Sequence, residues 1–287
     1  DIYEKERPVG IQIFGANLES MLRTVEIVEQ SNPDIIDINF GCPVKKVVSK
    51  GAGAGILKDI DLMVSLTEAM VKHTKLPITV KTRLGWDESS IKIVEVAERL
   101  QDVGCAAISI HGRTRKQMYK GEADWTRIGK IKENPRIHIP IFGNGDINSP
   151  QKAEEYRNKY GVDGIMIGRA SIGYPWIFDE IKHYFEYGVE AKKPTVEQRV
   201  AAAREHFELS LKWKEERYAI METRKHYTNY FRGLSHFKPY RTRLVTLENP
   251  NDVLLTLDEI ESEYIAKYGN DQDGPQSVST LTYKTER

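Results

Sequence analysis

The sequence has little cysteine, no excess of charge of either sign and no long apolar run. Its two cysteines, Cys42 and Cys105, are too few for a disulfide scaffold among 287 residues and form no CxxC pair, so we expect a reduced, cytoplasmic setting. The 42 basic residues balance the 42 acidic ones, so net charge alone does not indicate a nucleic-acid or membrane partner. No apolar run approaches the ~18 residues of a membrane span. The seven histidines show no metal-ligand spacing. We therefore expect neither a membrane nor a metal partner.

Short aliphatic runs alternate with amphipathic, helix-like segments, such as residues 18–30 and 90–103, through the first two thirds of the chain. The runs cover residues 9–14, 34–39, 77–83, 106–111, 138–144 and 164–168. This alternation predicts an α/β fold with a parallel sheet, either a barrel or an open doubly wound sheet. A (β/α)8 TIM barrel takes ~250 residues, so six units need ~190. The pattern ends near Gly188. We therefore predict a partial TIM barrel over residues 1–190, comprising strands three to eight and lacking the first two βα units.

From residue 191 the pattern becomes helical, with no strand signal. Helix-like stretches cover residues 196–216, 221–233 and 251–268, and Thr195 after Pro194 opens the first of them. We predict a small all-helical domain over residues 191–268. Residues 269–287 form a polar tail that we expect to be disordered.

Polar residues oppose the aliphatic face of several predicted strands near their carboxyl ends, because residues two apart in a strand share a face. These residues are Gln12, Asp37, Asn39, Thr79, Lys81, Arg83, Ser109, His111 and Arg113. Active sites of parallel barrels lie at the carboxyl ends of the strands, so this register predicts a ligand cup. Lys81 is either a cation facing a ligand that becomes anionic or a buried group neutralised by Asp37.

Glycine-rich turns follow the predicted strands. Residues 143–147 read GNGDI and residues 168–171 read GRAS, and together they are typical of the phosphate site after the last two strands of a barrel. Ordinary βα turns also favour these residue types. Cys42 follows another strand, between Gly41 and Pro43. The small residues 49–55 further along suggest a mobile loop that carries Cys42 over the mouth. Cys105, within an apolar run, is interpreted as a structural filler.

These motifs together resemble the tRNA-dihydrouridine synthase family, and its DusB-like branch in particular. The matching segments are IQIFG (11–15), IDINFGCP (36–43), KGAGAGIL (50–57), VKTRLGW (80–86), IHGRTR (110–115), GNGDI (143–147), IGRASIGYPWIF (167–178) and TRKHYTNYFRGL (223–234). The resemblance covers most of residues 9–240. The upstream strand that carries the family's Ala-Pro-Met flavin clasp has no match here, which agrees with the barrel arithmetic.

The resemblance implies an FMN-binding barrel, NADPH as reductant, and a helical domain that grips tRNA. The residues that match the flavin-contacting positions are Gln12, Lys81 and His111, and those that match the phosphate and ribityl region are Asn144, Gly145, Asp146, Gly168 and Arg169. Cys42 matches the catalytic acid, and Arg113 is a candidate RNA contact. A flavin hydride at C6 and a proton from Cys42 at C5 would reduce the uracil ring. An ordinary thiol is protonated at neutral pH and can donate that proton. The base must leave its stack to reach the cup.

The helical domain contains an acid-free segment, residues 223–243, that combines basic and aromatic residues. Its candidate RNA-binding residues are Arg224, Lys225, His226, Tyr230 and Arg232. The alternative is a solvated helix face whose aromatic residues lie in a core.

Two other functions stay open. One is an FMN-dependent dehydrogenase of free pyrimidines, which would not need the basic helical domain. The other is a non-catalytic tRNA-binding fragment, since two strands are absent from the pattern. We expect the chain to be a monomer in either case. The sequence does not identify the modified uridine or the preferred tRNAs.

Overall fold

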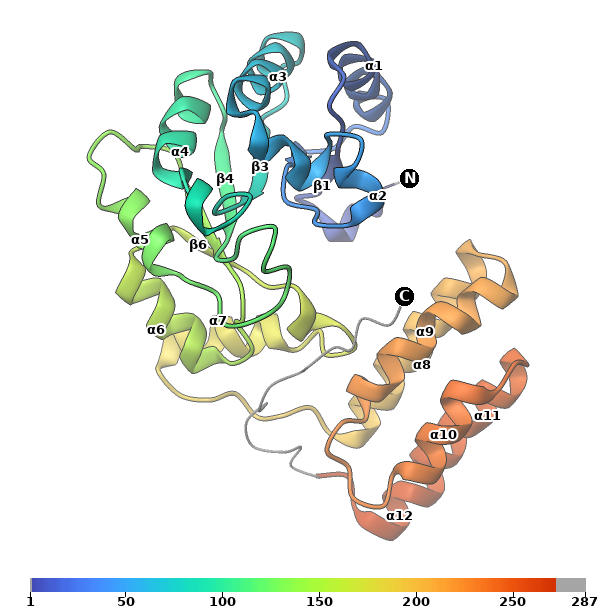
Figure 1. Cartoon of the computed structure of the whole chain (residues 1–287). Helices are drawn as coiled ribbons and strands as arrows, with labels where there is room; N and C mark the ends of the chain where they lie inside the picture. Colours follow the sequence, from blue (N-terminus) through green and yellow to red (C-terminus); the bar gives the residue numbers. More distant parts are fainter. Residues whose placement is uncertain (1, 272–287) are drawn as a thin grey trace. The chain divides into compact units, whose positions relative to one another are not determined.

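The computed structural model describes residues 2–271, which fold into two units (Figure 1). Among the described residues, the first unit comprises residues 2–147 and 153–167, and the second comprises residues 148–152 and 168–271. The tail predicted to be disordered lies outside the described residues from position 272. Within residues 2–271, no helix combines the length and apolarity that crossing a bilayer requires.

The first unit is built on one parallel sheet of six strands that follow one another in chain order. The strands are β1 (Gly10–Ile13), β2 (Ile35–Asn39), β3 (Ile78–Arg83), β4 (Ala107–His111), β5 (Ile141–Asn144) and β6 (Gly164–Met166). Every strand pairs with the next one in the chain, so the order lacks the reversal of a doubly wound sheet. Consecutive parallel strands are the arrangement found in a (β/α)8 barrel. The predicted α/β fold is therefore confirmed.

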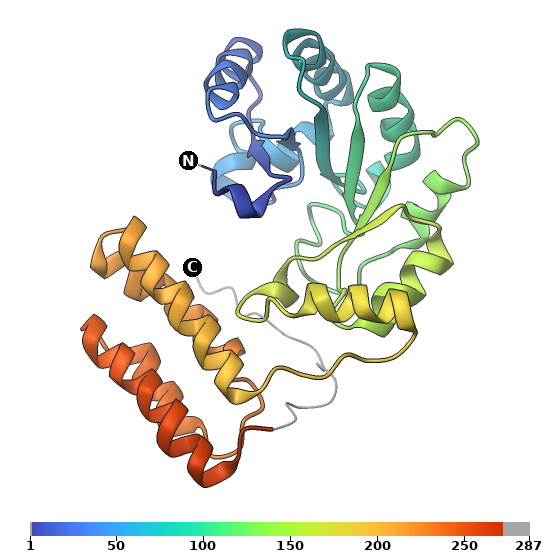
Figure 2. The ribbon, with the colours of Figure 1, turned by 180° about the vertical axis from the view of Figure 1, so that it is seen from behind.

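Helices follow the strands, and the longer ones lie along one side of the sheet, whereas the short α2 lies beside β1 (Figures 1 and 2). They are α1 (Leu18–Glu29), α2 (Lys45–Val48), α3 (Ile60–His73), α4 (Ile93–Asp102), α5 (Thr126–Lys132) and α6 (Pro150–Tyr160). Two begin at side-chain caps: the Asn17 amide oxygen accepts from the Ser20 N–H, and the Asp59 carboxylate accepts from the Leu62 N–H, each at 2.9 Å. Short 3₁₀ turns lie at Glu4–Glu6, Gly53–Lys58 and Glu88–Ser90.

The core lies between these helices and the aliphatic face of the sheet. Ile36, Ile38, Val80, Ile108 and Ile110 are each 0% exposed. A shift in register by one residue would turn all of them to the opposite face, at ~1.5–3 kcal/mol for each side chain exposed. Burial of these residues therefore fixes the polar residues between them on the other face.

The second unit is helical among its described residues. After the 3₁₀ turn Arg169–Ser171, it contains α7 (Ile177–Tyr187), α8 (Val196–Trp213), α9 (Glu216–Tyr230), α10 (Lys238–Thr246), α11 (Pro250–Glu259), the π-helical turn Ile260–Tyr264 and α12 (Ile265–Tyr268). Thr195 and Gln198 form a capping box at the start of α8. The predicted helical C-terminal region is confirmed, and α10 was missed because its KPYRTRLVT sequence has little apolar periodicity.

The core of the second unit joins α8, α9, α11 and the π-helical turn. Val200 and Phe207 from α8 are fully buried, and Tyr227 and Tyr230 from α9 are 1% and 6% exposed. Tyr264 from the π-helical turn is also buried and donates from its hydroxyl to the Ser235 carbonyl at 2.7 Å. The aromatic residues of the basic segment thus contribute to a packed core.

Candidate active site

Strand pairing places the predicted polar residues in tiers on the face opposite the core. In the lowest tier, Gln12 lies beside Asp37 and Asp37 beside Thr79. Two residues further along the strands, the next tier contains Asn39, Lys81 and Ser109, and the last contains Arg83, His111 and Asn144. Successive tiers share a face because side chains alternate in a strand. Gln12, Lys81, His111 and Asn144, which come from four different strands, therefore share one face at the carboxyl ends of the sheet.

A hydrogen-bond network joins the first three strands on this face. The Asp37 carboxylate accepts from Gln12 Nε2 at 2.6 Å and from Thr79 Oγ1 at 2.7 Å. Asn39 Nδ2 donates to Gln12 Oε1 at 2.7 Å. The Gln12 side chain is thereby held through both its amide nitrogen and its amide oxygen, which fixes its orientation.

The loop that carries Cys42 is tied to the same network. Asn39 Oδ1 accepts from the backbone N–H groups of both Gly41 and Cys42 at 2.9 Å. The Cys42 carbonyl accepts from the Ala54 N–H at 2.9 Å, and Arg83 Nε donates to the Gly41 carbonyl at 2.8 Å. The Cys42 thiol is free and half-buried. Four hydrogen bonds therefore position the residue that carries this thiol.

The prediction of a mobile loop after Cys42 is wrong for its second half. Residues 52–57 are buried, and most of them form the 3₁₀ turn Gly53–Lys58. A Cβ atom on Gly53 would meet the Cys42 carbonyl oxygen at 2.9 Å and the Cys42 Cβ at 3.0 Å. The small residues thus serve close packing against the Cys42 loop.

Lys81 and Arg83 make this end of the sheet cationic. Burial lowers the pKa of the Lys81 ammonium, and the neighbouring Arg83 lowers it further, whereas Asp37 acts in the opposite direction. Burial also lowers the pKa of Arg83 to about 10. Arg83 is 2% exposed and donates from Nη1 to the carbonyls of Thr114 and Met118 as well as from Nε to the Gly41 loop. Arg83 thus links the loops after β2 and β4, and the Lys81 side chain is poorly solvated.

His111 and Arg113 lie at the end of β4 and in the loop that follows it. Both are buried, at 6% and 2% exposure. Arg113 forms a two-pronged ion pair with Asp146, with 2.9 Å from Nη1 to Oδ1 and 2.7 Å from Nη2 to Oδ2. Asp146 also accepts from the Ala123 N–H at 2.8 Å. The structure therefore does not support the predicted RNA contact by Arg113, because its guanidinium does not face solvent. The Asp146 carboxylate is engaged within the protein, and the part of Asp146 in a cofactor site stays a prediction.

The GNGDI turn after β5 is rigidly packed. The Trp125 indole N–H donates to the Gly145 carbonyl at 2.9 Å, and the Trp125 ring covers Gly143. Gly145 has φ +124° and Asp146 has φ +59°, so the turn uses left-handed backbone. The Asn144 amide donates to the Met166 carbonyl of β6 at 2.8 Å. The turn thus presents a fixed backbone at the predicted phosphate region. Gly168 and Arg169 belong to the second unit, so their share in this site stays a prediction.

The predicted RNA-binding residues of the second unit differ in exposure. Lys225 is exposed, Arg232 is half-buried, and the Arg224 guanidinium donates to the Leu247 carbonyl at 2.9 Å at the end of α10. Tyr230 is a core residue, so its ring does not present a face for base stacking. The His226 ring lies 4.6 Å from the His206 ring, and burial, then His206, lowers the pKa of His226 to about 4.

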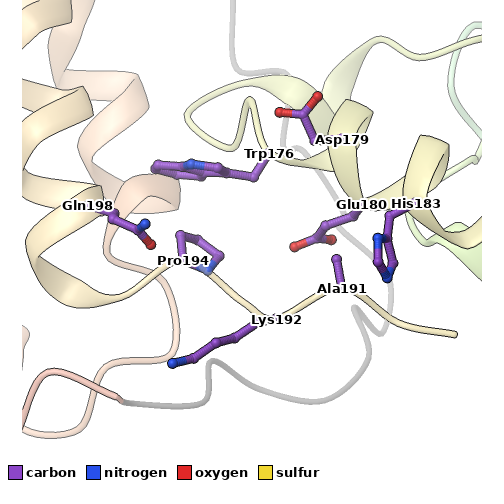
Figure 3. A pocket seen from close by; sticks show the side chains of 8 residues that line it. All are labelled: Trp176, Asp179, Glu180, His183, Ala191, Lys192, Pro194 and Gln198. Atoms are coloured by element: carbon purple, nitrogen blue, oxygen red, sulfur yellow. The ribbon is translucent and has the colours of Figure 1, made fainter.

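A separate cavity of about 290 Å³ lies within the second unit, between α7 and the start of α8 (Figure 3). It is lined by Trp176, Asp179, Glu180, His183, Ala191, Lys192, Pro194 and Gln198. Figure 3 shows Trp176 and Glu180 on one side of the cavity and the segment with Lys192 and Pro194 on the other. Glu180 is 3% exposed and accepts from the Tyr174 hydroxyl at 2.5 Å and from Lys193 Nζ at 3.0 Å. This carboxylate is satisfied internally, and the lining contains none of the predicted site residues.

Sequence reasoning missed Tyr119, an aromatic residue in the loop after β4. Its side chain is 47% exposed, and its ring lies 6.3 Å from the His111 ring and 5.7 Å from the Arg83 guanidinium. The signal that could have found it was an aromatic residue between the basic residues of the KQMYK segment. Cys105, by contrast, is buried as expected of a filler, and burial raises the pKa of its thiol to about 12.

The arrangement has the features of an anion-tolerant ligand site at the carboxyl ends of parallel strands: a poorly solvated lysine, a buried histidine, two fixed amides and a half-buried thiol. Comparison with known proteins identifies the family of the chain. The family described as dihydrouridine synthase (Dus) matches residues 1–266, and the chain belongs to this family.

In the two relatives described here, somewhat more than a third of the aligned residues are identical to those of the chain. It is 36% identical over 257 residues to a probable tRNA-dihydrouridine synthase 1 of Synechocystis, which covers 88% of this chain and 72% of the relative. It is 37% identical over 242 residues to tRNA-dihydrouridine synthase B of Pseudomonas putida, covering 84% and 71%. A distant likeness to a crystal structure of mandelate oxidase covers 62% of this chain and 56% of that one, with 18% identity and a TM-score of 0.42.

Proposed function

We propose that this chain is a tRNA-dihydrouridine synthase that uses FMN and NADPH to reduce the C5=C6 bond of uridines in tRNA. The observation that carries the proposal is the half-buried thiol of Cys42, a residue whose backbone N–H donates to Asn39, at the end of the sheet that also presents Lys81 and His111. Family membership supports the reaction, and the geometry supports these residues as its site.

The polar face fits a flavin nucleotide by its donor set. Gln12 and Asn144 supply amides, Lys81 a cation and His111 an imidazole, and the GNGDI turn supplies backbone that can approach a phosphate closely. When bound, FMN would supply the hydride for C6, with NADPH as its reductant. Lys81 would hold a positive charge near the anionic form of the cofactor, and its poor solvation makes that interaction stronger than it would be in water.

Cys42 would supply the proton that the reduced ring needs at C5. Its Sγ–H bond breaks, the proton passes to C5, and the thiolate left behind lies in a cationic environment that includes Lys81 and Arg83. The exposed Tyr119 ring beside His111 is suited to stack on a base that has left the RNA helix. Exposed basic residues of the second unit, such as Lys225, would contact RNA phosphates.

The test is a comparison of dihydrouridine yield. The full chain is supplied with FMN, NADPH and unmodified tRNA, and the wild type is compared with Cys42→Ala and with Cys105→Ala as a matched control. We expect Cys42→Ala to lose at least about a hundredfold in rate, the usual scale for removing a general acid. Cys105→Ala should keep the wild-type rate, because its thiol is buried in the core.

The other outcomes distinguish the alternatives. Equal yields for wild type and Cys42→Ala would remove Cys42 from the mechanism. Oxidation of the reduced flavoprotein by free uracil would favour a dehydrogenase of free pyrimidines. A purified chain that binds tRNA and no FMN would favour a non-catalytic tRNA-binding protein.

A further inference from the structure

The Arg113 side chain is buried, so it is accessible to neither solvent nor RNA. A guanidinium has five N–H groups and no acceptor. In Arg113 these groups face five acceptors: the Lys120 carbonyl from Nε, Asp146 Oδ1 and His111 Nε2 from Nη1, and the Gly121 carbonyl and Asp146 Oδ2 from Nη2. With every donor engaged and 2% exposure, the group acts within the protein.

One of these contacts decides the protonation of the His111 ring. Arg113 Nη1 lies 3.2 Å from His111 Nε2. Because arginine can only donate, Nε2 must accept, and an imidazole nitrogen that accepts carries no proton. The remaining proton of a neutral ring is then on Nδ1.

The turn after β5 holds the ring in the orientation that this contact needs. A Cβ atom on Gly145 would meet His111 Cδ2 at 3.0 Å and Nε2 at 3.3 Å, so the Nε2 edge of the ring packs directly against this glycine. Asp146, the next residue, orients the guanidinium through its two-pronged ion pair. The same turn thus fixes both the acceptor edge of the ring and the donor that faces it.

We infer that Arg113 is a positioning residue that fixes His111 as the neutral tautomer with its proton on Nδ1, and that Asp146 supports it by orienting the guanidinium. His111 then offers Nδ1–H as a hydrogen-bond donor of fixed identity. The inference rests on the proposed function only for its consequence: such a donor suits a carbonyl oxygen or an unprotonated ring nitrogen of a flavin. The tautomer itself follows from the contacts and needs no cofactor.

The experiment measures the tautomer directly in the full chain without added FMN. Protein labelled with ¹⁵N-histidine gives long-range ¹H–¹⁵N spectra in which the Nδ1–H form, the Nε2–H form and the imidazolium have different patterns. His111→Gln assigns the signals by loss of one set. At pH 8 we expect the wild-type His111 ring to show the Nδ1–H pattern alone, and a ring with its proton on Nε2, or on both nitrogens, would overturn the inference.

Variants then test whether Arg113 is the cause. Arg113→Met removes the donor and keeps the length of the side chain, so Nε2–H signals should appear beside the Nδ1–H signals. Arg99→Met is the matched control, because it is the same substitution at an arginine that pairs with Asp61 and Glu95 instead. Arg113→Gln, whose short amide cannot reach Nε2, is the second variant if Arg113→Met does not fold. A folded Arg113 variant whose His111 signals match the wild type would also overturn the inference.

A second readout separates this inference from the proposed function. FMN affinity of Arg113→Met should fall about threefold to tenfold, the scale of one hydrogen bond. If the tautomer shifts as expected and the wild type does not bind FMN, the proposed function fails and the tautomer assignment stands. If FMN binds and the wild-type ring has its proton on Nε2, the assignment fails and the proposed function stands.

Discussion

A methyl group added at Gly143 provides a sharp test of how the GNGDI turn is built. The ideal Cβ of Gly143→Ala would lie 1.9 Å from Trp125 Cζ3 and 2.3 Å from Cη2. Carbon atoms in contact are about 3.5 Å apart, so the indole must move by about 1.5 Å. Trp125 is 1% exposed and its ring also packs against Tyr156, with 5.1 Å between centroids, so the surrounding core resists that movement.

The expected cost has two parts. Forcing an extra methyl group into a well-packed core costs about 1–3 kcal/mol. Displacing the indole also breaks the hydrogen bond from Trp125 Nε1 to the buried Gly145 carbonyl, at about 1 kcal/mol. We therefore expect Gly143→Ala to lower the free energy of unfolding by about 2–4 kcal/mol, and to weaken FMN binding because the turn loses its support.

Urea unfolding followed by far-UV circular dichroism measures the difference. Gly10→Ala is the matched control, since its Cβ would make only ordinary contacts, the nearest at 3.7 Å to Ile35 Cβ. That variant should unfold within about 0.5 kcal/mol of the wild type, the usual range where no packing is disturbed. If Gly143→Ala is as stable as Gly10→Ala, the packing argument for this turn is refuted.

Three further predictions concern the other parts of the molecule. Asn39→Ala leaves the N–H groups of Gly41 and Cys42 without their acceptor, so the free energy of unfolding measured by thermal denaturation should fall by about 1–3 kcal/mol, and a variant as stable as the wild type would contradict this role of Asn39. Burial lowers the pKa of His226 from 6.5 to about 4, so the His226 ring binds a proton less readily in the folded state than in the unfolded state. The contribution of the neutral ring to the free energy of unfolding is therefore complete above pH 6.5 and is lost as the pH falls toward 4. The melting temperature of His226→Gln should therefore decline less between pH 6.5 and pH 4 than that of the wild type, by the equivalent of about 1 kcal/mol after allowance for solvent screening. The same dependence of melting temperature on pH in both proteins would contradict this prediction. Lys225→Ala should reduce the slope of log K for tRNA against log salt by about 0.7–0.9, the effect of one phosphate contact, while Tyr230→Phe should leave tRNA affinity unchanged because its ring is buried.

The strands and their two faces could be predicted because alternation is a local property of the chain. Gln12, Lys81 and His111 were assigned to one face from sequence spacing alone, and the observed register places them there. Their shared position at the sheet edge then follows from parallel pairing. Local pattern therefore sufficed for the position of these residues.

The partners of these residues could not be predicted, because they lie far apart in the sequence. Arg113 pairs with Asp146 across 33 positions, and this pairing changes Arg113 from an RNA contact into an internal support. The predicted RNA-binding role of Tyr230 disagrees with its burial for a different reason. A basic and aromatic helix segment has the same composition whether its rings face RNA or a core. The side of the helix that is buried depends on α8 and the π-helical turn, which lie elsewhere in the chain.

The series of hydrogen bonds from the Thr79 hydroxyl through Asp37, Gln12 and Asn39 to the Cys42 backbone limits which substitutions the protein can accept. Each of these residues is the hydrogen-bond partner of the next, so substituting one leaves a polar group of a neighbouring residue without its hydrogen-bond partner. Tolerated changes should therefore come as compensating pairs, and a randomised library that varies these positions jointly should yield more working enzymes than one that varies them singly.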